Sequence, residues 1–389
     1  MLTLTFDTQP VRAEPRTWTV NDDGPADFQT IQEAIDASSN GDTILVSEGV
    51  YAEWDIEIYK SLTILANGTV TVDGFQRFYV FKVTANNVTI SGFIVTNSSF
   101  CGISVSSNYN LIKNNEVVRN TQSGIILFDS HHNVIGNNSL SQNHGGIELG
   151  HSLYNVVKEN SIALNHGGML LAYSDENLIE SNIIEYNRPY SGIWLESRSS
   201  NNIIARNMLS GNENTIALTH AGRNFIYHNN FISSGNQVYM WEQEDSCVWD
   251  DGYPSGGNYW SDYEQKHPNA KEIDDSGIWD TPYVIDENNQ DNYPLMKPWS
   301  LKPSSPLEAT QELIETIESW NLTKGTGNSL KAKLKVAIHM LDLGKEDGGI
   351  RKLTAFINRV EMLREKTLTN EQADELVLEA QRIIDLING

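Results

Sequence analysis

The chain has 389 residues, enough for two or three domains of ordinary size or for one long repeat domain. Its 51 acidic and 27 basic side chains give a formal net charge of −24, which argues against a nucleic-acid partner, because phosphate neutralisation needs a basic surface. No apolar run approaches the roughly 18 residues of a transmembrane helix, so no membrane-spanning segment is expected.

Residues 1–17 are either the remnant of a secretory signal or an ordinary first strand. An apolar start followed by Val11-Arg12-Ala13 resembles a signal with its cleavage site, although no charged n-region precedes it. Sequons at Asn67, Asn97 and Asn321 are candidate glycosylation sites and fit export, although sequons also arise by chance in an Asn-rich chain. A secreted or cell-surface location is therefore expected.

Residues 27–37 are predicted to form a short helix that closes one end of the following domain. Ile31, Ala34 and Ile35 have helical spacing, and a strand pattern follows at 43–46. The exposed core and strand edges at the end of a solenoid need such a cap.

A repeat of about 22 residues dominates the middle of the chain. Gly-Ile-x-Leu cores recur, and their inward positions include Ile125, Ile147 and Met169. Apolar residues alternate with period two in short runs bounded by Asn, Ser and Gly, which indicates strands and turns. The repeat is too short for a propeller blade and lacks a leucine-rich consensus. A parallel β-helix with about three strands per coil is therefore predicted.

One column of asparagines marks a corner of this solenoid. It contains Asn115, Asn138, Asn160, Asn182, Asn207 and Asn229. We expect these residues to adopt left-handed backbone conformations and to hydrogen-bond through their amides between coils.

Aromatic side chains are predicted on the outer face of the coils. The outward and flanking positions hold Phe128, Trp194, Tyr239, Trp241, Tyr173, Tyr190, His144 and His166. Such a face suits stacking against sugar rings or a partner protein. The alternative is that a loop of the protein itself covers it.

An acidic segment, residues 242–299, is predicted to cap the last coil. Between residues 242 and 291 it has 14 acidic side chains against Lys266 and Lys271. Asp274, Asp275 and Asp280 are candidate calcium ligands in an Asp-rich turn whose spacing departs from the EF-hand pattern. The alternative is a solvated acidic cap without metal.

Residues 300–306 form a Pro/Ser-rich linker, and residues 307–389 are predicted to be a four-helix domain. Apolar residues keep helical spacing over four segments, with Asn328 and Thr369 as expected capping residues.

Three sequence motifs reveal a family resemblance over roughly residues 18–299. They are the D-F-x-T-I-Q-x-A-I-D-A run from Asp27, the G-D-T-I run from Gly41, and a closing signature at 257–263 with 291–296. The chain resembles the right-handed parallel β-helix proteins of the NosD-like and carbohydrate-binding-and-sugar-hydrolysis group. This implies an all-β solenoid, a fold that carries lyases, hydrolases, epimerases, adhesins and copper-maturation accessories.

The helical segment is similar to the FIMAH domain of secreted archaeal and bacterial proteins. The residues that carry this similarity lie at 327–330, 355–358 and 368–373. The resemblance implies a role in attachment or assembly, and it brings no catalytic motif.

Candidate catalytic groups on the outer face are few. Glu148 and Glu196 should lie about 11 to 12 Å apart, outside the roughly 5 to 9.5 Å range of paired glycosidase carboxylates. Asp129 and His151, one coil apart, are either an acid–base pair or a hydrogen-bonded surface pair. The two outward columns of the repeat contain no basic residue for a lyase, and an epimerase-type D-P-H-D motif is absent.

The NosD-like resemblance also prompts a test for copper. His144 and His166 should stack about 5 Å apart, close enough for a shared transition metal, although stacking alone is the simpler interpretation. Cys101 and Cys247 fall about six coils apart, so no disulfide between them is expected.

Three functions follow as hypotheses. The first is a secreted or cell-surface β-helix that binds a polysaccharide or cell-surface glycan on its outer face, with the helical domain for attachment or assembly. The second is a polysaccharide-processing lyase, hydrolase or epimerase using the same groove. The third is a self-assembling subunit of a surface layer or filament.

Overall fold

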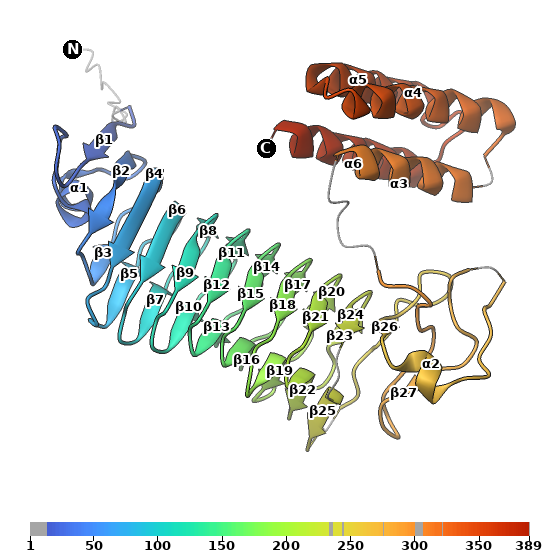
Figure 1. Cartoon of the computed structure of the whole chain (residues 1–389), viewed down its shortest axis with the longest axis horizontal. Helices are drawn as coiled ribbons and strands as arrows, with labels where there is room; N and C mark the ends of the chain where they lie inside the picture. Colours follow the sequence, from blue (N-terminus) through green and yellow to red (C-terminus); the bar gives the residue numbers. More distant parts are fainter. Residues whose placement is uncertain are drawn as a thin grey trace, which may run out of the picture. The chain divides into compact units, whose positions relative to one another are not determined.

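A computed structural model describes residues 14–232, 236–242, 245–274, 276–299, 306–320 and 322–388. The chain divides into two compact units, residues 1–299 and 300–389, which are described separately. Figure 1 shows the strands of the first unit stacked in coils along the chain.

The first unit is a parallel β-helix with two main sheets. The nine-stranded sheet contains β3 (Ile56–Ile58), β5 (Tyr79–Val83), β7 (Cys101–Val105), β10 (Ser123–Phe128), β13 (Gly145–Gly150), β16 (Gly167–Ala172), β19 (Ser191–Glu196), β22 (Asn214–Thr219) and β25 (Asn236–Trp241).

A 17-stranded sheet forms the other sides of the coils. Its first strands are β1 (Thr17–Val20), β2 (Thr43–Tyr51), β4 (Thr63–Asp73) and β6 (Thr89–Thr96). One row follows with β8 (Leu111–Lys113), β11 (Val134–Gly136), β14 (Val156–Lys158), β17 (Leu178–Glu180), β20 (Ile203–Ala205) and β23 (Phe225–Tyr227). The second row is β9 (Glu116–Val118), β12 (Ser139–Ser141), β15 (Ser161–Ala163), β18 (Ile183–Glu185), β21 (Met208–Ser210), β24 (Asn230–Ile232) and β26 (Tyr259–Trp260).

The predicted interior row is confirmed. Ile125 pairs with Ile147, and Ile147 pairs with Met169, in parallel register. All three side chains are buried. The coils also begin earlier than the Gly-Ile repeat indicates: β2 and β4, with 9 and 11 residues, already pair in parallel although they lack that motif.

Buried asparagines form three ladders, of which the sequence analysis found one. The predicted column is confirmed: the Oδ1 of Asn160 accepts from the backbone N and Nδ2 of Asn138, and its Nδ2 donates to Ile135 O and to Asn182 Oδ1. The two further ladders are Asn110, Asn133, Asn155, Asn177, Asn202 and Asn224, and Asn120, Asn143, Asn165, Asn187 and Asn212. A spacing of five residues within each coil is their sequence signal.

The expectation of left-handed backbone at the Asn column is wrong by one residue. Positive φ belongs to the preceding residues, such as Asn137 at 53° and Glu159 at 59°. The preceding residue turns the corner, so the ladder asparagine can direct its amide inward, between coils.

The helix predicted at 27–37 is α1 (Ile31–Ala37), and its buried residues are Ile31, Ala34 and Ile35. The Thr30 side chain caps its first turn by accepting from Glu33 N at 3.2 Å. Glu53 accepts from the backbone N of Ile31 at 2.8 Å. These contacts fix the helix against the first coil, with its apolar side in the core.

The acidic segment closes the last coil through its closing signature. It contains the short helix α2 (Tyr263–Lys266) and the strands β27 (Tyr283–Val284) and β28 (Gln290–Asp291). Asn258 extends an asparagine ladder by accepting from Asn229 N at 3.0 Å, and the Trp260 ring stacks on Tyr283 with ring centroids 4.0 Å apart. Asp291 is fully buried and accepts from Asn258 N, Trp260 Nε1 and Tyr293 N.

The second unit contains α3 (Pro306–Ser319), α4 (Lys324–Asp342), α5 (Glu346–Leu363) and α6 (Asn370–Asn388), packed around a core that includes Leu334, Phe356 and Ile383. Thr369 caps α6 as expected, because its Oγ1 accepts from Gln372 N while its own N–H donates to Gln372 Oε1. Asn328 is not a cap, since it lies inside α4, which begins four residues earlier. Among the described helices, none has the length and apolar character needed to cross a membrane.

Asn160→Ala is expected to lower the free energy of unfolding by about 3 kcal/mol, because it leaves several buried polar groups of adjacent coils without partners. Ser161→Ala, at the exposed neighbouring position, is the control and should change stability little. Denaturant unfolding of the two variants tests this expectation, and equal midpoints would contradict it.

Asp291 gives the C-terminal cap a pH dependence. Burial raises the pKa of its carboxyl from 3.8 to about 7, against the opposing effect of its three N–H donors. The folded protein therefore holds this proton more tightly than the unfolded chain. The stabilisation is complete below about pH 4 and is lost as the pH rises through about 7.

Comparison with Asp291→Asn, which cannot titrate, isolates this effect. The stability of the wild type minus that of the variant should fall between pH 4 and 7 by up to about 1.4 kcal/mol per pH unit. Thermal and denaturant unfolding across this range measure the difference. A difference that stays constant or rises with pH would count against the buried proton.

Candidate functional site

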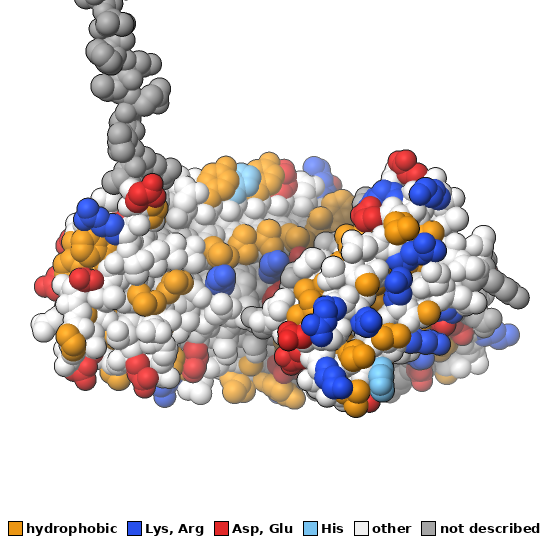
Figure 2. Space-filling model, turned by 90° about the horizontal axis from the view of Figure 1, so that it is seen from above, with side chains coloured by type: hydrophobic (Ala, Val, Ile, Leu, Met, Phe, Trp, Pro, Cys, Tyr) orange, Lys and Arg blue, Asp and Glu red, His pale blue; other side chains and the backbone are white. Residues whose placement is uncertain are grey.

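The outer face of the nine-stranded sheet carries most of the predicted ligand-binding residues. Four outward-facing positions pair with one another along the stack of coils. They are Ile126 on β10, Glu148 on β13, Leu170 on β16 and Trp194 on β19. These four side chains are half-buried, whereas Phe128 is 51% exposed. Apolar side chains also gather in patches elsewhere on the molecule, as Figure 2 shows for one view.

A pocket of about 330 Å³ opens on this face across β13, β16 and β19. Trp194, Tyr190 and His144 supply its aromatic lining, and Glu148 supplies a carboxylate. Gly145 and Gly167 occupy equivalent positions on adjacent coils, whereas the coils on either side of this pair carry Ser123 and Ser191 there. The pocket therefore combines ring faces with a floor lowered by two glycines, an arrangement suited to a flat hydroxylated ligand.

Tyr190 reaches the pocket from a corner that is longer than its neighbours. In the preceding coil one residue lies between the ladder position Asn165 and the sheet position Gly167, whereas three residues lie between Asn187 and Ser191. The extra residues place the Tyr190 ring within 5.6 Å of the His144 ring, measured between centroids. His144 is itself 5.1 Å from His166, with the rings edge to face at 68°.

The two outward glutamates lie in different surroundings. Glu148 Oε1 accepts from Ser123 Oγ at 2.5 Å. Glu196 is half-buried, and desolvation followed by the negative charge of Glu148 raises the pKa of its carboxyl. From the pairing register, two coils and two residues separate the pair, about 12 Å. The pairing register on which the expected spacing rests is therefore confirmed.

The opposite edge of the face is also aromatic. His151 stacks on Tyr173 with centroids 4.8 Å apart and an interplanar angle of 5°, and it lies edge-on to Phe128 at 5.6 Å. No hydrogen bond joins His151 to Asp129 in the described part of the chain, so the expected surface pair is replaced by ring stacking.

Tyr239 and Trp241 lie at the far end of the face, on β25, and are 40% and 52% exposed. A separate hollow of about 780 Å³ brings Trp241 beside Asp286 and Glu287 of the acidic cap. The cap therefore borders this end of the face. None of the described residues of the cap lines the Trp194 pocket.

Sequence reasoning missed the groups that shape the pocket. Ser123 positions Glu148, and Gly145 and Gly167 lower the floor. The paired glycines at 145–146 and 167–168 were the available signal, since only the second glycine of each pair belongs to the Gly-Ile-x-Leu repeat. Phe78 and Phe100, stacked at 4.5 Å, extend the His144 edge toward the N-terminal coils, and their 22-residue spacing is also visible in the sequence.

Metal binding was tested against the donor groups. In the described ranges, no group of three or more His, Cys, Asp or Glu is placed to hold an ion. Asp280 Oδ1 accepts from Lys271 N and Thr281 Oγ1, which lowers the pKa of its carboxyl. Asp274 lies in the preceding turn, and Asp275 lies outside the described residues.

The two cysteines are buried free thiols. Burial, above all other causes, raises the pKa of Cys247 to about 11 and raises that of Cys101 still further. Neither thiol is disposed to ionise near neutral pH, as a thiolate ligand must.

The candidate glycosylation sites differ in accessibility. Asn67 is exposed. Asn97 is half-buried, and its Nδ2 donates to Asp73 Oδ1 at 2.7 Å, so the nitrogen that would carry a glycan is engaged. Asn321 lies outside the described residues, as do residues 1–13 of the proposed signal.

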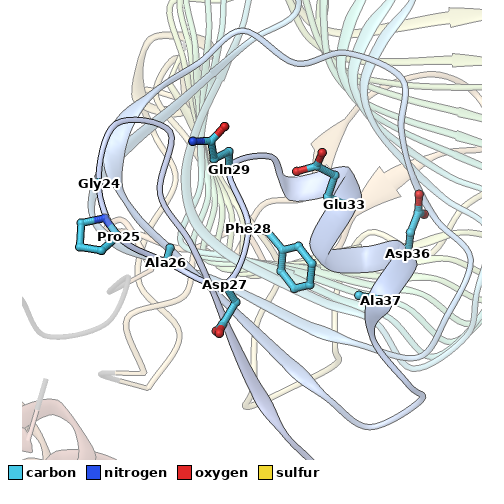
Figure 3. A pocket seen from close by; sticks show the side chains of 9 residues that line it. All are labelled: Gly24, Pro25, Ala26, Asp27, Phe28, Gln29, Glu33, Asp36 and Ala37. Atoms are coloured by element: carbon cyan, nitrogen blue, oxygen red, sulfur yellow. The ribbon is translucent and has the colours of Figure 1, made fainter.

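A further pocket of about 580 Å³ lies at the N-terminal cap. Figure 3 shows the Phe28 ring beside helix α1 and the Asp27 side chain turned away from it. The Asp27 carboxylate already accepts from the backbone N and Oγ1 of Thr19. The Asp27 carboxylate therefore helps to hold the N-terminal cap together.

Comparisons with known proteins agree with this architecture. Residues 31–265 match the family described as "Periplasmic copper-binding protein (NosD)", and residues 307–385 match the FIMAH domain. No curated protein shows significant similarity to the chain.

Solved structures resemble the fold at low identity. XylC, solved in complex with xylose, is 12% identical with a TM-score of 0.50, covering 62% of this chain and 71% of XylC. Pectate lyase Pel9A is 15% identical with a TM-score of 0.49, covering 76% and 91%. An alginate lyase from Paenibacillus sp. str. FPU-7 is 16% identical with a TM-score of 0.39, covering 59% and 99%.

At these identities the solved structures bear on the fold alone. The family match is the stronger finding, because it spans more than half of the chain and includes the coils, the asparagine ladders and the sheet that bears the pocket. The chain belongs to the NosD family and carries a FIMAH domain after its β-helix.

Proposed function

We propose that this protein binds a polysaccharide or cell-surface glycan on the outer face of its nine-stranded sheet. The observation that carries the proposal is the Trp194 pocket, in which aromatic rings and a carboxylate surround a glycine floor. Ring faces stack on the apolar faces of sugars, while carboxylates and imidazoles exchange hydrogen bonds with hydroxyls.

The continuation of aromatic groups along the sheet supports a chain-like ligand. His144, His166 and Tyr190 line one edge, with Phe128 and Tyr173 on the other, and Tyr239 and Trp241 follow at one end. Stacked coils repeat about every 4.8 Å. Contacts repeated at this interval suit an extended polymer better than a compact metabolite.

The proposal also covers where the protein acts and what its helical domain does. The family description names a periplasmic protein, which supports a place outside the cytoplasm, at the cell surface or in the secreted fraction. We assign the FIMAH domain to attachment or assembly. Its packed core accounts for the buried apolar residues.

Copper, which the family description names, does not fit the described residues as a resident metal. His144 and His166 are near each other but no third ligand joins them, and both thiols are buried. No step of the proposed function therefore passes through copper.

Hydrolysis on the same face is less well supported than binding. The raised pKa of Glu196 suits a general acid, but the separation of about 12 Å from Glu148 exceeds the range used by paired glycosidase carboxylates. Incubation with neutral glycans and uronans, followed by product analysis, separates the enzyme hypothesis from binding.

Trp194→Ala is expected to weaken glycan binding about tenfold through loss of a stacking contact. Gly167→Leu should abolish binding by filling the pocket. An added Cβ at Gly167 has nothing nearer than Tyr190 Cβ at 3.5 Å, so the fold tolerates the substitution. Affinity electrophoresis or calorimetry with a neutral glycan panel measures both effects.

Ser161→Leu is the matched control, because it adds the same side chain to an exposed position on the other sheet within the same coil. It should bind glycans like the wild type. If every glycan fails to bind the wild-type protein, or if Gly167→Leu binds normally, the sheet face is not the glycan site.

A further inference from the structure

We infer that the sheet face selects neutral glycans over chains of uronic acid. This inference rests on the proposed function and specifies the ligand class of the same site. It depends on the charges that line the face.

From β7 to β25, the outward positions of the face offer carboxylates and no basic side chain to a bound polymer. Along the outward positions of β7 to β25, all within the described residues, the charged side chains are Glu148 and Glu196. A uronate unit stacked on Trp194 would bring its own carboxylate near Glu148, which lines the same pocket. Like charges a few ångströms apart repel, most strongly where water is partly excluded.

Four basic side chains border the pocket or lie along the same coils. Arg188, on the corner that carries Tyr190, is exposed, and its Nε donates to Gly211 O at 2.9 Å. Lys82 lies in the same outward column as Glu148, three coils away, and its Nζ pairs with Glu57 at 3.1 Å. Arg119 lines a hollow on the other side of His144 and does not line the Trp194 pocket. Arg198 is exposed in the turn after β19 and is the cation to test directly.

Calcium bridging is the other route by which carboxylates accept uronates, and the donor geometry opposes it. A bridging calcium ion needs several oxygen ligands at about 2.3 to 2.6 Å. Glu148 and Glu196, about 12 Å apart, cannot share one ion. No carboxylate cluster of the required kind occurs in the part of the chain that the structure describes.

Neutral sugars match these groups. Each hydroxyl can donate to a carboxylate oxygen, and Glu148 is already oriented by Ser123. Tyr190 and Trp194 contribute ring surface that needs no charge on the ligand. The same residues that repel uronates thus accept neutral chains.

The test is calorimetry on the full chain with two sets of hexasaccharides. The neutral set is xylohexaose, cellohexaose and mannohexaose, and the acidic set is hexagalacturonate and hexaguluronate. Titrations at pH 8, above the ordinary range of histidine, are run with EDTA and again with calcium, each at about 20 mM and about 500 mM NaCl.

At least one neutral hexamer should bind, with affinity changing less than about twofold between the two salt concentrations. Uronates should bind at least about tenfold more weakly, with or without calcium. Glu148→Gln combined with Glu196→Gln should improve uronate binding about fivefold or more and leave neutral binding within about threefold.

Uronate binding as tight as neutral binding, lost in Trp194→Ala or Arg198→Ala or gained with calcium, would overturn this inference while leaving glycan binding intact. Absence of binding by both sets would instead remove the proposed function itself. The two failures are therefore distinguishable in one experiment.

Discussion

The structure depends on asparagine amides that lie between successive coils. Within the ladders, an amide typically donates to a backbone carbonyl of the preceding coil and accepts from the backbone N–H of the preceding ladder residue, as Asn160 does with Ile135 and Asn138. A short coil must turn sharply, and its corners leave buried backbone groups that strands cannot pair. The ladders satisfy these groups and fix the vertical register, which also places the outward columns of the sheet.

The sequence predicted this register well because a coil converts spacing into neighbours. The interior row and the distance between His144 and His166 followed from a 22-residue period. Two of the three asparagine ladders were missed because only one column of asparagines was followed from coil to coil. The other two columns have the same coil period and are offset from it by five residues in each direction. The glycine repeat alone did not reveal the first coils, because the longer strands β2 and β4 lack it, although the family resemblance covered this part of the chain.

The pocket was harder to predict than the fold. Its aromatic residues were named in advance, but its depth depends on the absence of side chains at Gly145 and Gly167 and on the path of the corner that carries Tyr190. Neither follows from an alternating pattern. The predicted pair of Asp129 and His151 failed for a similar reason, since ring stacking with Tyr173 governs the orientation of the imidazole. The closing signature lies in the segment that the sequence predicted to cap the last coil, but the contacts that make the cap were not predictable. Asn258 continues an asparagine ladder, and the buried Asp291 accepts from Trp260 Nε1.

In the coil that carries Tyr190, one part of the corner holds the asparagine ladder and another part forms the wall of the pocket. The ladders run uninterrupted past it, from Asn165 through Asn187 to Asn212, although two residues have been added between Asn187 and Ser191. An insertion there changes the wall of the pocket without shifting any interior row. Related β-helices can thus acquire new ligand preferences by lengthening or trimming single corners, while the buried amides preserve the architecture unchanged.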